Sequence, residues 1–164
     1  MAAFLKLEGV DGQSPDDKHT KWIEIQSFSN NMMQTGAFGK DGSLTNSTVS
    51  LSEFSFQKEM DVATPTICEK LATGAKIDKC VVHFVAATGG NDSFVYAKYE
   101  FTPCIVAAYS VGGGTSAKPT ESISIRFQTM RWEYTTYDEQ TGGNTVRSGW
   151  DSGKNIKDTS NVSE

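Results

Sequence analysis

Residues Met60–Lys76, MDVATPTICEKLATGAK, form the one stretch of the chain whose pattern predicts a helix. Thr64 can cap the free backbone amides of a helix start, and Pro65 suits the first helical position, where no amide hydrogen is needed. Gly74 stands where a left-handed residue commonly ends a helix. The side chains expected on the buried face are Ile67, Cys68, Leu71 and Ala72. A helix of about ten residues is too short to be stable alone in water, so it must pack on another element.

The segments on both sides of this helix alternate apolar and polar residues, as β-strands do. They are 3–8, 22–29, 49–56, 80–85, 94–101, 105–111 and 121–134. A Gly-rich turn at 88–92 predicts a hairpin, and Pro103 is expected to interrupt the strands around it. With about seven strands and one helix, we expect a mainly β protein, a small β-barrel of two packed sheets with one flanking α-helix.

Two strands change the face on which their apolar residues lie. In 121–134 the change predicts a β-bulge near Gln128. In 49–56 it predicts either a bulge near Glu53 or burial on both faces. Segment 22–29 places Ile23 and Ile25 on one face and carries large apolar groups on the other as well. We therefore expect protein on both sides of it.

Residues 35–43 contain three glycines and one large aromatic, Phe38. This composition is typical of a flexible, protruding loop. Phe38 is either an anchor against the body of the protein, which we favour, or an exposed contact for a partner.

The composition bounds the domain organisation and the partners. The chain has 164 residues and a net charge of −5, with no cluster of Lys or Arg, so nucleic acid is not an expected partner. We expect one domain over 1–157 and a flexible tail over 158–164. Neither a signal peptide nor a membrane-inserting segment is predicted. Cys68, Cys80 and Cys104 form no CxxC pair, which favours free thiols in a reducing compartment.

No catalytic or cofactor-binding motif is found, so we expect no enzyme activity, no cofactor and no metal. His19 lies beside Asp16 and Asp17, where it could bind a cation weakly or serve a hydrolase, although a polar loop is a poor substrate pocket. His83 could bind a metal with Cys80 and Cys104, but the spacing matches no standard pattern. Aromatic residues that could stack on a sugar, or simply fill the core, are Trp132, Tyr134, Tyr137 and Trp150.

Several short motifs follow one another along nearly the whole chain. They are Asp11–Ser14 leading to His19, Ile23–Ser29 before the Gly-rich loop, Phe54–Asp61 with Thr64 and Pro65, Leu71–Gly74, Glu121–Phe127 with Trp132–Tyr134, and Gly149–Asp151 beside Asn155. Together they resemble the Hcp (haemolysin-coregulated protein) family, the tube subunits of bacterial type VI secretion.

The resemblance implies a homohexameric ring that stacks into a tube. Such a tube lies inside contractile sheath proteins, carries a spike protein at its tip and is expelled into a target cell. Small effector proteins can travel in its lumen. The implied location is the bacterial cytoplasm before assembly and then secretion through the type VI apparatus, without a signal peptide.

The resemblance also implies roles for individual residues. The ring-stacking loop would comprise Phe38, Gly39, Lys40, Asp41 and Gly42. For the ring interface we predict Trp22 and Phe28, because they share a strand face that carries polar neighbours. Ser29 matches a small polar lumen position but has the parity of Ile23 and Ile25. It reaches the lumen only if the strand twists; otherwise the lumen face is the one bearing Glu24 and Gln26.

A different class stays open at this point. A monomeric β-barrel could hold a small ligand or a carbohydrate, with Tyr96, Tyr109 and Trp132 lining its cavity. The mass of the particle in solution separates the two hypotheses, because a ring has a multiple of the mass of the 17.8 kDa chain.

Overall fold

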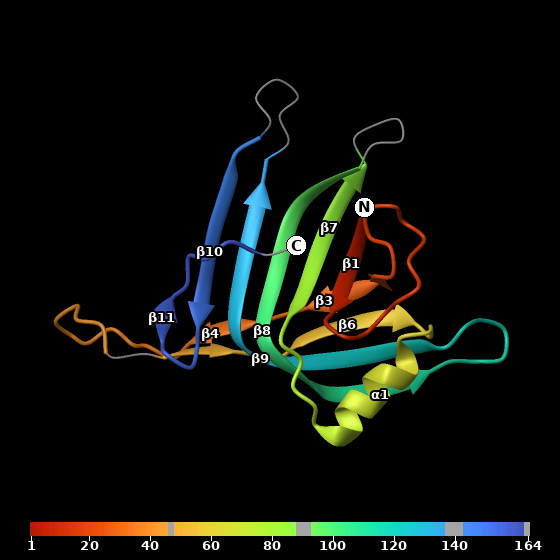
Figure 1. Cartoon of the computed structure of the whole chain (residues 1–164). Coiled ribbons are helices and arrows are strands. Elements are labelled where there is room, and N and C mark those ends of the chain that lie inside the picture. The colour runs from red at the N-terminus through yellow and green to blue at the C-terminus, as the bar shows by residue number, and fades with distance from the viewer. Residues whose placement is uncertain (46–47, 88–92, 137–142, 163–164) are drawn as a thin grey trace.

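The structure, a computed structural model, describes residues 1–45, 48–87, 93–136 and 143–162. The described part of the chain is mainly β with one helix, as the alternation predicts (Figure 1). Its elements are β1 Ala2–Leu7, β2 Ile23–Ile25, β3 Ser27–Ser29, β4 Met32–Gln34, β5 Val49–Leu51, β6 Phe54–Glu59, α1 Thr64–Thr73, β7 Cys80–Ala87, β8 Ser93–Gly112, β9 Thr120–Thr135, β10 Thr145–Asp151 and β11 Ile156–Lys157. The expected turn at 88–92 lies outside the described residues.

Two long strands, β8 and β9, organise the fold. They pair along their whole length and bend together, so that each contributes to two layers (Figure 1). The upright layer consists of their paired ends with β7, β1, β2, β10 and β11, and the lower layer consists of the other halves with β6 and β3. The two expected sheets are thus parts of one nine-stranded antiparallel sheet, accompanied by the two-stranded sheet of β4 and β5.

The predicted bulge near Gln128 is wrong. Phe101 pairs with Met130 and Cys104 with Phe127 without any change of register, and the register of these two strands shifts only between Val106 and Ala108. All four side chains nevertheless contribute to the same core. Between these two pairs, β8 and β9 therefore both change the side of the strand that points into the core, because the sheet bends sharply there. Two strands that turn together need no extra residue.

Pro103 lies at this fold and does not interrupt the strand, contrary to expectation, because β8 runs from Ser93 to Gly112. Proline cannot donate a ladder hydrogen bond, and at the bend none is required of it. The backbone of its neighbour Cys104 instead exchanges two hydrogen bonds of 2.8 Å with Ile77.

The predicted strand 22–29 is broken at Gln26. β2 pairs with β1 in the upright layer, whereas β3 pairs with β6 in the lower layer. The Gln26 amide donates to the carbonyl oxygen of Gln57 at 2.8 Å, which holds the bend. Strand pairing therefore runs from β2 through β1, β7, β8, β9 and β6 to β3, and β2 and β3 are joined through the chain at Gln26 rather than by pairing.

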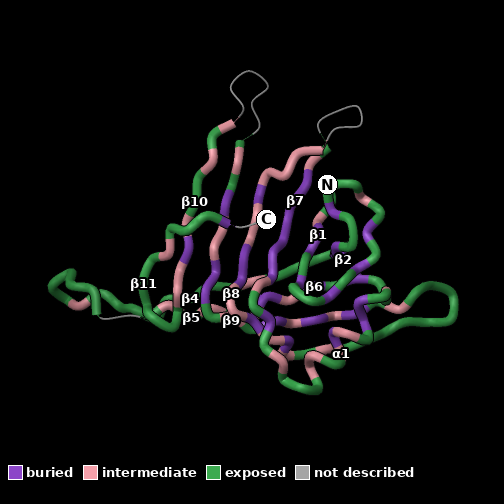
Figure 2. The backbone as a smooth tube through the Cα atoms, in the orientation of Figure 1, coloured by how far each residue is buried: buried purple, intermediate pink, exposed green. Residues whose placement is uncertain are grey.

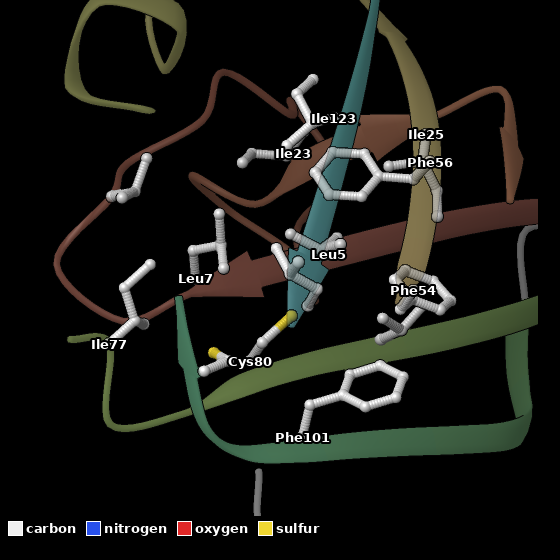
Figure 3. Close-up of a cluster of buried hydrophobic side chains, with 14 of the residues drawn as sticks. Leu5, Leu7, Ile23, Ile25, Phe54, Phe56, Ile77, Cys80, Phe101 and Ile123 are labelled. Atoms are coloured by element: carbon white, nitrogen blue, oxygen red, sulfur yellow. The ribbon is translucent and has the colours of Figure 1, made fainter. Parts of the chain in front are cut away.

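The apolar core fills the angle between the two layers. Side chains from six strands and from the segment before β7 point toward one another there (Figure 3). They include Leu5, Leu7, Ile23, Ile25, Phe54, Phe56, Ile77, Cys80, Phe101 and Ile123. Figure 2 shows the buried residues gathered in the strands of the two layers, whereas the loops are largely exposed. Neither alternative for Glu53 holds, since the chain ends β5 and starts β6 in another sheet.

The helix α1 begins and ends close to the predicted residues. Gly74 ends it with φ 63°, and Pro65 lies in its first turn. Thr64 is not the N-cap, however; that position is Ala63, whose amide donates to the Asp61 carboxylate at 2.9 Å. Ile67 is fully buried against the sheet, whereas Ala72, expected on the same face, is exposed. The helix therefore packs mainly through its first two turns.

A buried charge network fixes the start of α1 on the lower layer. Lys58 Nζ lies 2.6 Å from Asp61 Oδ1 and 2.7 Å from Glu121 Oε2. Thr64 Oγ1 donates to Glu121 at 2.9 Å, and the Tyr109 hydroxyl donates to the same carboxylate at 2.9 Å. Burial and this hydrogen bond raise the pKa of Tyr109 to about 12. The Lys58 and Glu121 side chains are fully buried, so each depends on the other for charge compensation.

Residues of the segment expected to be mobile contact the upright layer. Arg131 Nη2 lies 2.7 Å from Asp158 Oδ2, and the Asp158 amide donates to Gly149 at 2.9 Å. Val162 is buried. The Asp158 pKa is lowered to about 2, chiefly by its hydrogen bond from Arg131. The described part of the tail is thus attached through charge pairing and burial.

Candidate functional site

The outer face of the lower layer is lined by hydroxyl groups. In β6 and β9 the residues between buried Phe54, Phe56, Ile123 and Ile125 are serines and a glutamine that point away from the core. We call this surface the serine face; it comprises Ser27, Ser29, Ser55, Gln57, Ser110, Ser122 and Ser124. All seven are exposed or half-buried.

Strand register places these side chains in two rows across four strands. One row contains Ser29, Ser55 and Ser124, and the other contains Ser27, Gln57, Ser122 and Ser110. Directly opposed residues of antiparallel strands lie on the same side of the sheet. Hydrogen bonds of 2.7 Å between the Ser55 and Ser124 hydroxyls and 3.0 Å from Ser27 to Gln57 link neighbouring strands. The seven residues of the serine face are uncharged, whereas Glu53 with Arg126 lies beyond one end of the rows and exposed Glu59 lies beyond the other.

The bend at Gln26 explains how Ser29 joins this face. Phe28 pairs with Phe56 and so points to the core side, whereas Ser29 pairs with Ser55 and points outward. In an unbroken strand Ser29 would share the buried face of Ile25. The twist that Ser29 requires is therefore present, and it lies before the residue rather than after it.

Glu24 and Gln26, the alternative residues predicted for the lumen, lie outside the serine face. Glu24 pairs with Phe4 of β1 and is exposed on the outer side of the upright layer. Gln26 is exposed at the bend, where its side-chain amide donates to the Glu59 carboxylate at 3.4 Å. Ser29 and Glu24 consequently belong to different layers.

Trp22 and Phe28 do not share a face, so the reason given for pairing them is wrong. The Trp22 ring packs 4.6 Å from the ring of His83, whereas the Phe28 ring packs 4.7 Å from that of Phe84. His83 and Phe84 are successive residues of β7 and point to opposite sides. Trp22 is only 8% exposed, while Phe28 keeps 46% of its surface accessible.

The stacking loop is exposed and internally hydrogen-bonded. Phe38 is 77% exposed and pairs with Leu44, which is 67% exposed, so the favoured anchor role is wrong. The Gly39 amide donates to Ser43 at 2.7 Å, and the Asp41 carboxylate accepts from the Ser43 hydroxyl at 2.6 Å. That hydrogen bond lowers the pKa of Asp41. The hairpin projects away from the body of the protein (Figure 1).

His19 is buried, although the residues around it in the sequence are polar. Its Nδ1 lies 2.8 Å from Asp16 Oδ1, and its ring stacks on Phe4 with centroids 4.3 Å apart. Gly12 makes this possible, because a Cβ there would lie 2.3 Å from the carbonyl oxygen of Trp22. Glycine is needed where backbones approach this closely. Sequence reasoning missed this cluster because its partners are distant in the chain.

The alternative sites receive no support from the geometry. Cys80 points into the core and His83 to the other side of β7, and the described ranges contain no group of three metal-ligating side chains. Burial raises the pKa of the Cys104 thiol to about 12. Tyr109 lies in the lower layer and Tyr96 in the upright layer, so they line no common cavity with Trp132. Tyr137 lies outside the described residues.

Comparison with known proteins connects this fold to one family. The family model described as "Type VI secretion system effector, Hcp" matches residues 4–134. The chain belongs to the Hcp family. Protein hcp1 of Pseudomonas aeruginosa is 25% identical over 157 residues, 94% of this chain and 96% of that protein. The described residues contain no helix long and apolar enough to cross a membrane.

Solved structures agree with this assignment. A structure described as a type six secretion system protein is 26% identical, with a TM-score of 0.87, and the match covers 96% of this chain and 99% of that one. Hcp1 from Salmonella typhimurium is 30% identical, with a TM-score of 0.79 and coverage of 95% and 97%. The mainly β fold with one helix and the type VI secretion family, both predicted from the sequence, are confirmed.

Proposed function

We propose that this Hcp protein is a tube subunit that closes into a homohexameric ring, and that rings stack into an inner tube with effector proteins in its bore. The serine face is the observation that carries this proposal. A tube that passes folded cargo needs a wall that is wet and does not hold cargo tightly, and a neutral hydroxyl surface has both properties.

The proposed bore wall is therefore the serine face, in which Ser29 lies in the row of Ser55 and Ser124. Charge at one end of this surface is compensated, since Arg126 Nη2 lies 2.5 Å from Glu53 Oε1. Glu24 and Gln26 then lie away from the centre of the wall, on the outer side of the upright layer and at the bend.

Ring closure and stacking use other surfaces in this proposal. Phe28, whose side chain is 46% exposed beside the core, supplies apolar contact area between neighbours in the ring. Trp22, proposed for the same interface, offers only its exposed edge. The loop Phe38–Gly42 contacts the next ring. Sheath and spike proteins remain partners outside the tube, and the protein leaves the bacterial cytoplasm only through the assembled apparatus.

Thiol accessibility tests the assignment of the bore. Ser124→Cys places a thiol on the serine face, and Val62→Cys places one next to α1, where Val62 is 61% exposed. In assembled tubes a small maleimide should modify both variants, whereas a maleimide attached to a large folded protein should modify only Val62→Cys. Equal modification of both by the large reagent would place the serine face on the outside of the tube. The unsubstituted chain corrects for the half-buried Cys68.

A further inference from the structure

Lys58 contacts two carboxylates in the interior of the protein. Its Nζ lies 2.6 Å from Asp61 Oδ1 and 2.7 Å from Glu121 Oε2, and the side chains of Lys58, Asp61 and Glu121 are 0%, 8% and 0% exposed. We propose that Lys58 and Asp61 react with each other in the folded chain and form an intramolecular amide (isopeptide) bond, with Glu121 as the catalytic residue. This modification does not depend on the proposed ring or tube.

Strand register and a tight turn bring the three groups together. Lys58 and Glu121 are directly opposed in the neighbouring strands β6 and β9, so their side chains leave the sheet on the same side. Asp61 lies in the turn between β6 and α1. The Asp61 carboxylate accepts from the Ala63 amide at 2.9 Å, and the Asp61 amide donates to Thr64 Oγ1 at 3.3 Å. The reacting groups are therefore held in contact, which is the condition that makes intramolecular reactions fast.

Burial favours the nucleophilic form of the lysine. An ammonium beside a carboxylate differs from an amine beside a carboxylic acid only in the position of one proton. Removal from water disfavours charged groups, so the interior shifts this balance toward the amine and the acid. The amine has a lone pair with which to attack a carboxyl carbon, whereas the ammonium has none. The Glu59 carbonyl oxygen at 3.0 Å and Thr64 Oγ1 at 3.3 Å can hold hydrogens of the amine.

The reaction is a condensation that releases one water molecule. Lys58 Nζ attacks Cγ of the protonated Asp61 carboxyl group, so a nitrogen–carbon bond forms and the bond from Cγ to one oxygen breaks. Glu121 takes a proton from the attacking nitrogen and returns it to the departing hydroxyl, which regenerates the carboxylate. The other oxygen becomes the amide oxygen, and the Ala63 N–H stabilises the negative charge that develops on it. The atoms balance without a co-reactant.

Two hydroxyl groups orient Glu121 for this role. Thr64 donates to Oε2 and Tyr109 donates to Oε1, both at 2.9 Å. The direction of each oxygen is thus fixed, and Oε2 lies next to Lys58. The same hydroxyls can still donate to the carboxylate after the amide has formed. The new bond closes the turn 58–61 covalently and fixes the start of α1 on β6.

Mass spectrometry of the purified full chain tests the bond. After incubation of the folded protein, we expect an intact mass that is lower than the mass of the sequence by one water molecule. Trypsin digestion of the subsequently denatured chain then locates the bond. Trypsin should not cleave after Lys58, because the lysine nitrogen is part of an amide. A single peptide 41–70 should therefore replace the peptides 41–58 and 59–70.

The same digest contains a control. Lys76 Nζ lies 3.0 Å from Asp78 Oδ1, but both side chains are exposed to water, so cleavage after Lys76 should stay complete. An unchanged mass with complete cleavage after Lys58 would overturn the proposal. Loss of water with complete cleavage after Lys58 would overturn it as well, because the dehydration would then lie elsewhere. A peptide 41–70 joined to the peptide that contains Glu121 would overturn Asp61 as the reacting partner.

Two variants test the catalytic residue. Glu121→Gln keeps the size of the side chain but removes the proton acceptor, so the lighter species should form at least about a hundredfold more slowly. Glu59→Gln, at the neighbouring exposed position, should leave the rate unchanged. Equal rates in the two variants would overturn the role of Glu121. The mass of the unsubstituted chain decides whether the bond forms, so that result does not depend on the folding of a variant.

Discussion

His19 Nε2 lies 3.0 Å from His83 Nδ1 and joins the loop 10–22 to the middle of β7. The carboxylate of Asp16 can only accept, so with neutral rings His19 carries its hydrogen on Nδ1 and accepts from His83 Nδ1. That arrangement leaves the lone pair of His83 Nε2 buried, with no partner among the described residues. Burial, together with Lys98 and His19, lowers the pKa of His83 to about 3.

The first prediction concerns acid stability. Unfolded His83 titrates near 6.5 and folded His83 near 3, so the unfolded state binds more protons between these values. The free energy of unfolding should therefore fall as the pH drops from 6.5 toward 3, by at most about 1.4 kcal/mol per unit from this residue. Urea unfolding at pH 7 and pH 5 measures it. In His83→Asn the difference between the two pH values should shrink; an equal difference would show that other groups cause it.

The second prediction concerns the buried charge network at α1. Lys58→Met leaves the carboxylates of Asp61 and Glu121 without their cation, and we expect a loss of roughly 3–5 kcal/mol in the free energy of unfolding. Lys76→Met removes a 66% exposed lysine that pairs with Asp78, and should change stability by less than about 1 kcal/mol. Denaturant titration compares them. Similar stabilities for the two variants would mean that the network contributes little.

The third prediction separates stacking from ring closure. Deleting Phe38–Asp41 removes the exposed tip but no core residue, so the ring mass should stay unchanged while tubes disappear from negatively stained images. Val62→Ser, which alters an exposed apolar residue elsewhere, should leave both unchanged. If the deletion dissociates the ring, the loop belongs to the interface between neighbours in the ring.

The fourth prediction concerns the bore. Ser29→Arg places an exposed arginine beside Ser55, so the melting temperature and ring mass should change little. A collar of positive charges would then line the bore and block the passage of effector proteins. A secretion assay with the tube protein and its cargo measured side by side checks this. Strong destabilisation would show that Ser29 is packed, and unaltered cargo export would place it outside the bore.

Capping signals and alternation predicted the helix and most strands, and the resemblance of short motifs predicted the family, but neither predicted the bends. The change in parity of the apolar residues of β9 is visible in the sequence. A β-bulge and a bend of the whole sheet both produce this pattern in a single strand. Only the partner strand, in which Phe101 and Cys104 change face together, distinguishes them. Likewise the bend at Gln26 depends on its hydrogen bond to Gln57, about thirty residues away in sequence.

In the candidate site, too, some features could be predicted from the local sequence and others depend on residues distant in the chain. The exposure of Phe38 and the burial of His19 depend on what lies nearby in space, and composition carries no such information. Serines at alternate positions of β6 and β9 are visible in the sequence, and they indicate an outward face. Their alignment into rows could be recognised only from the strand register.

Native mass spectrometry of the full chain at tens of micromolar tests the central claim most directly. Each chain has a mass of 17.8 kDa, and we predict a dominant species of six chains, with larger species only in multiples of that ring. A single species at the mass of one chain would contradict the account, because an isolated subunit has no bore for the serine face to line.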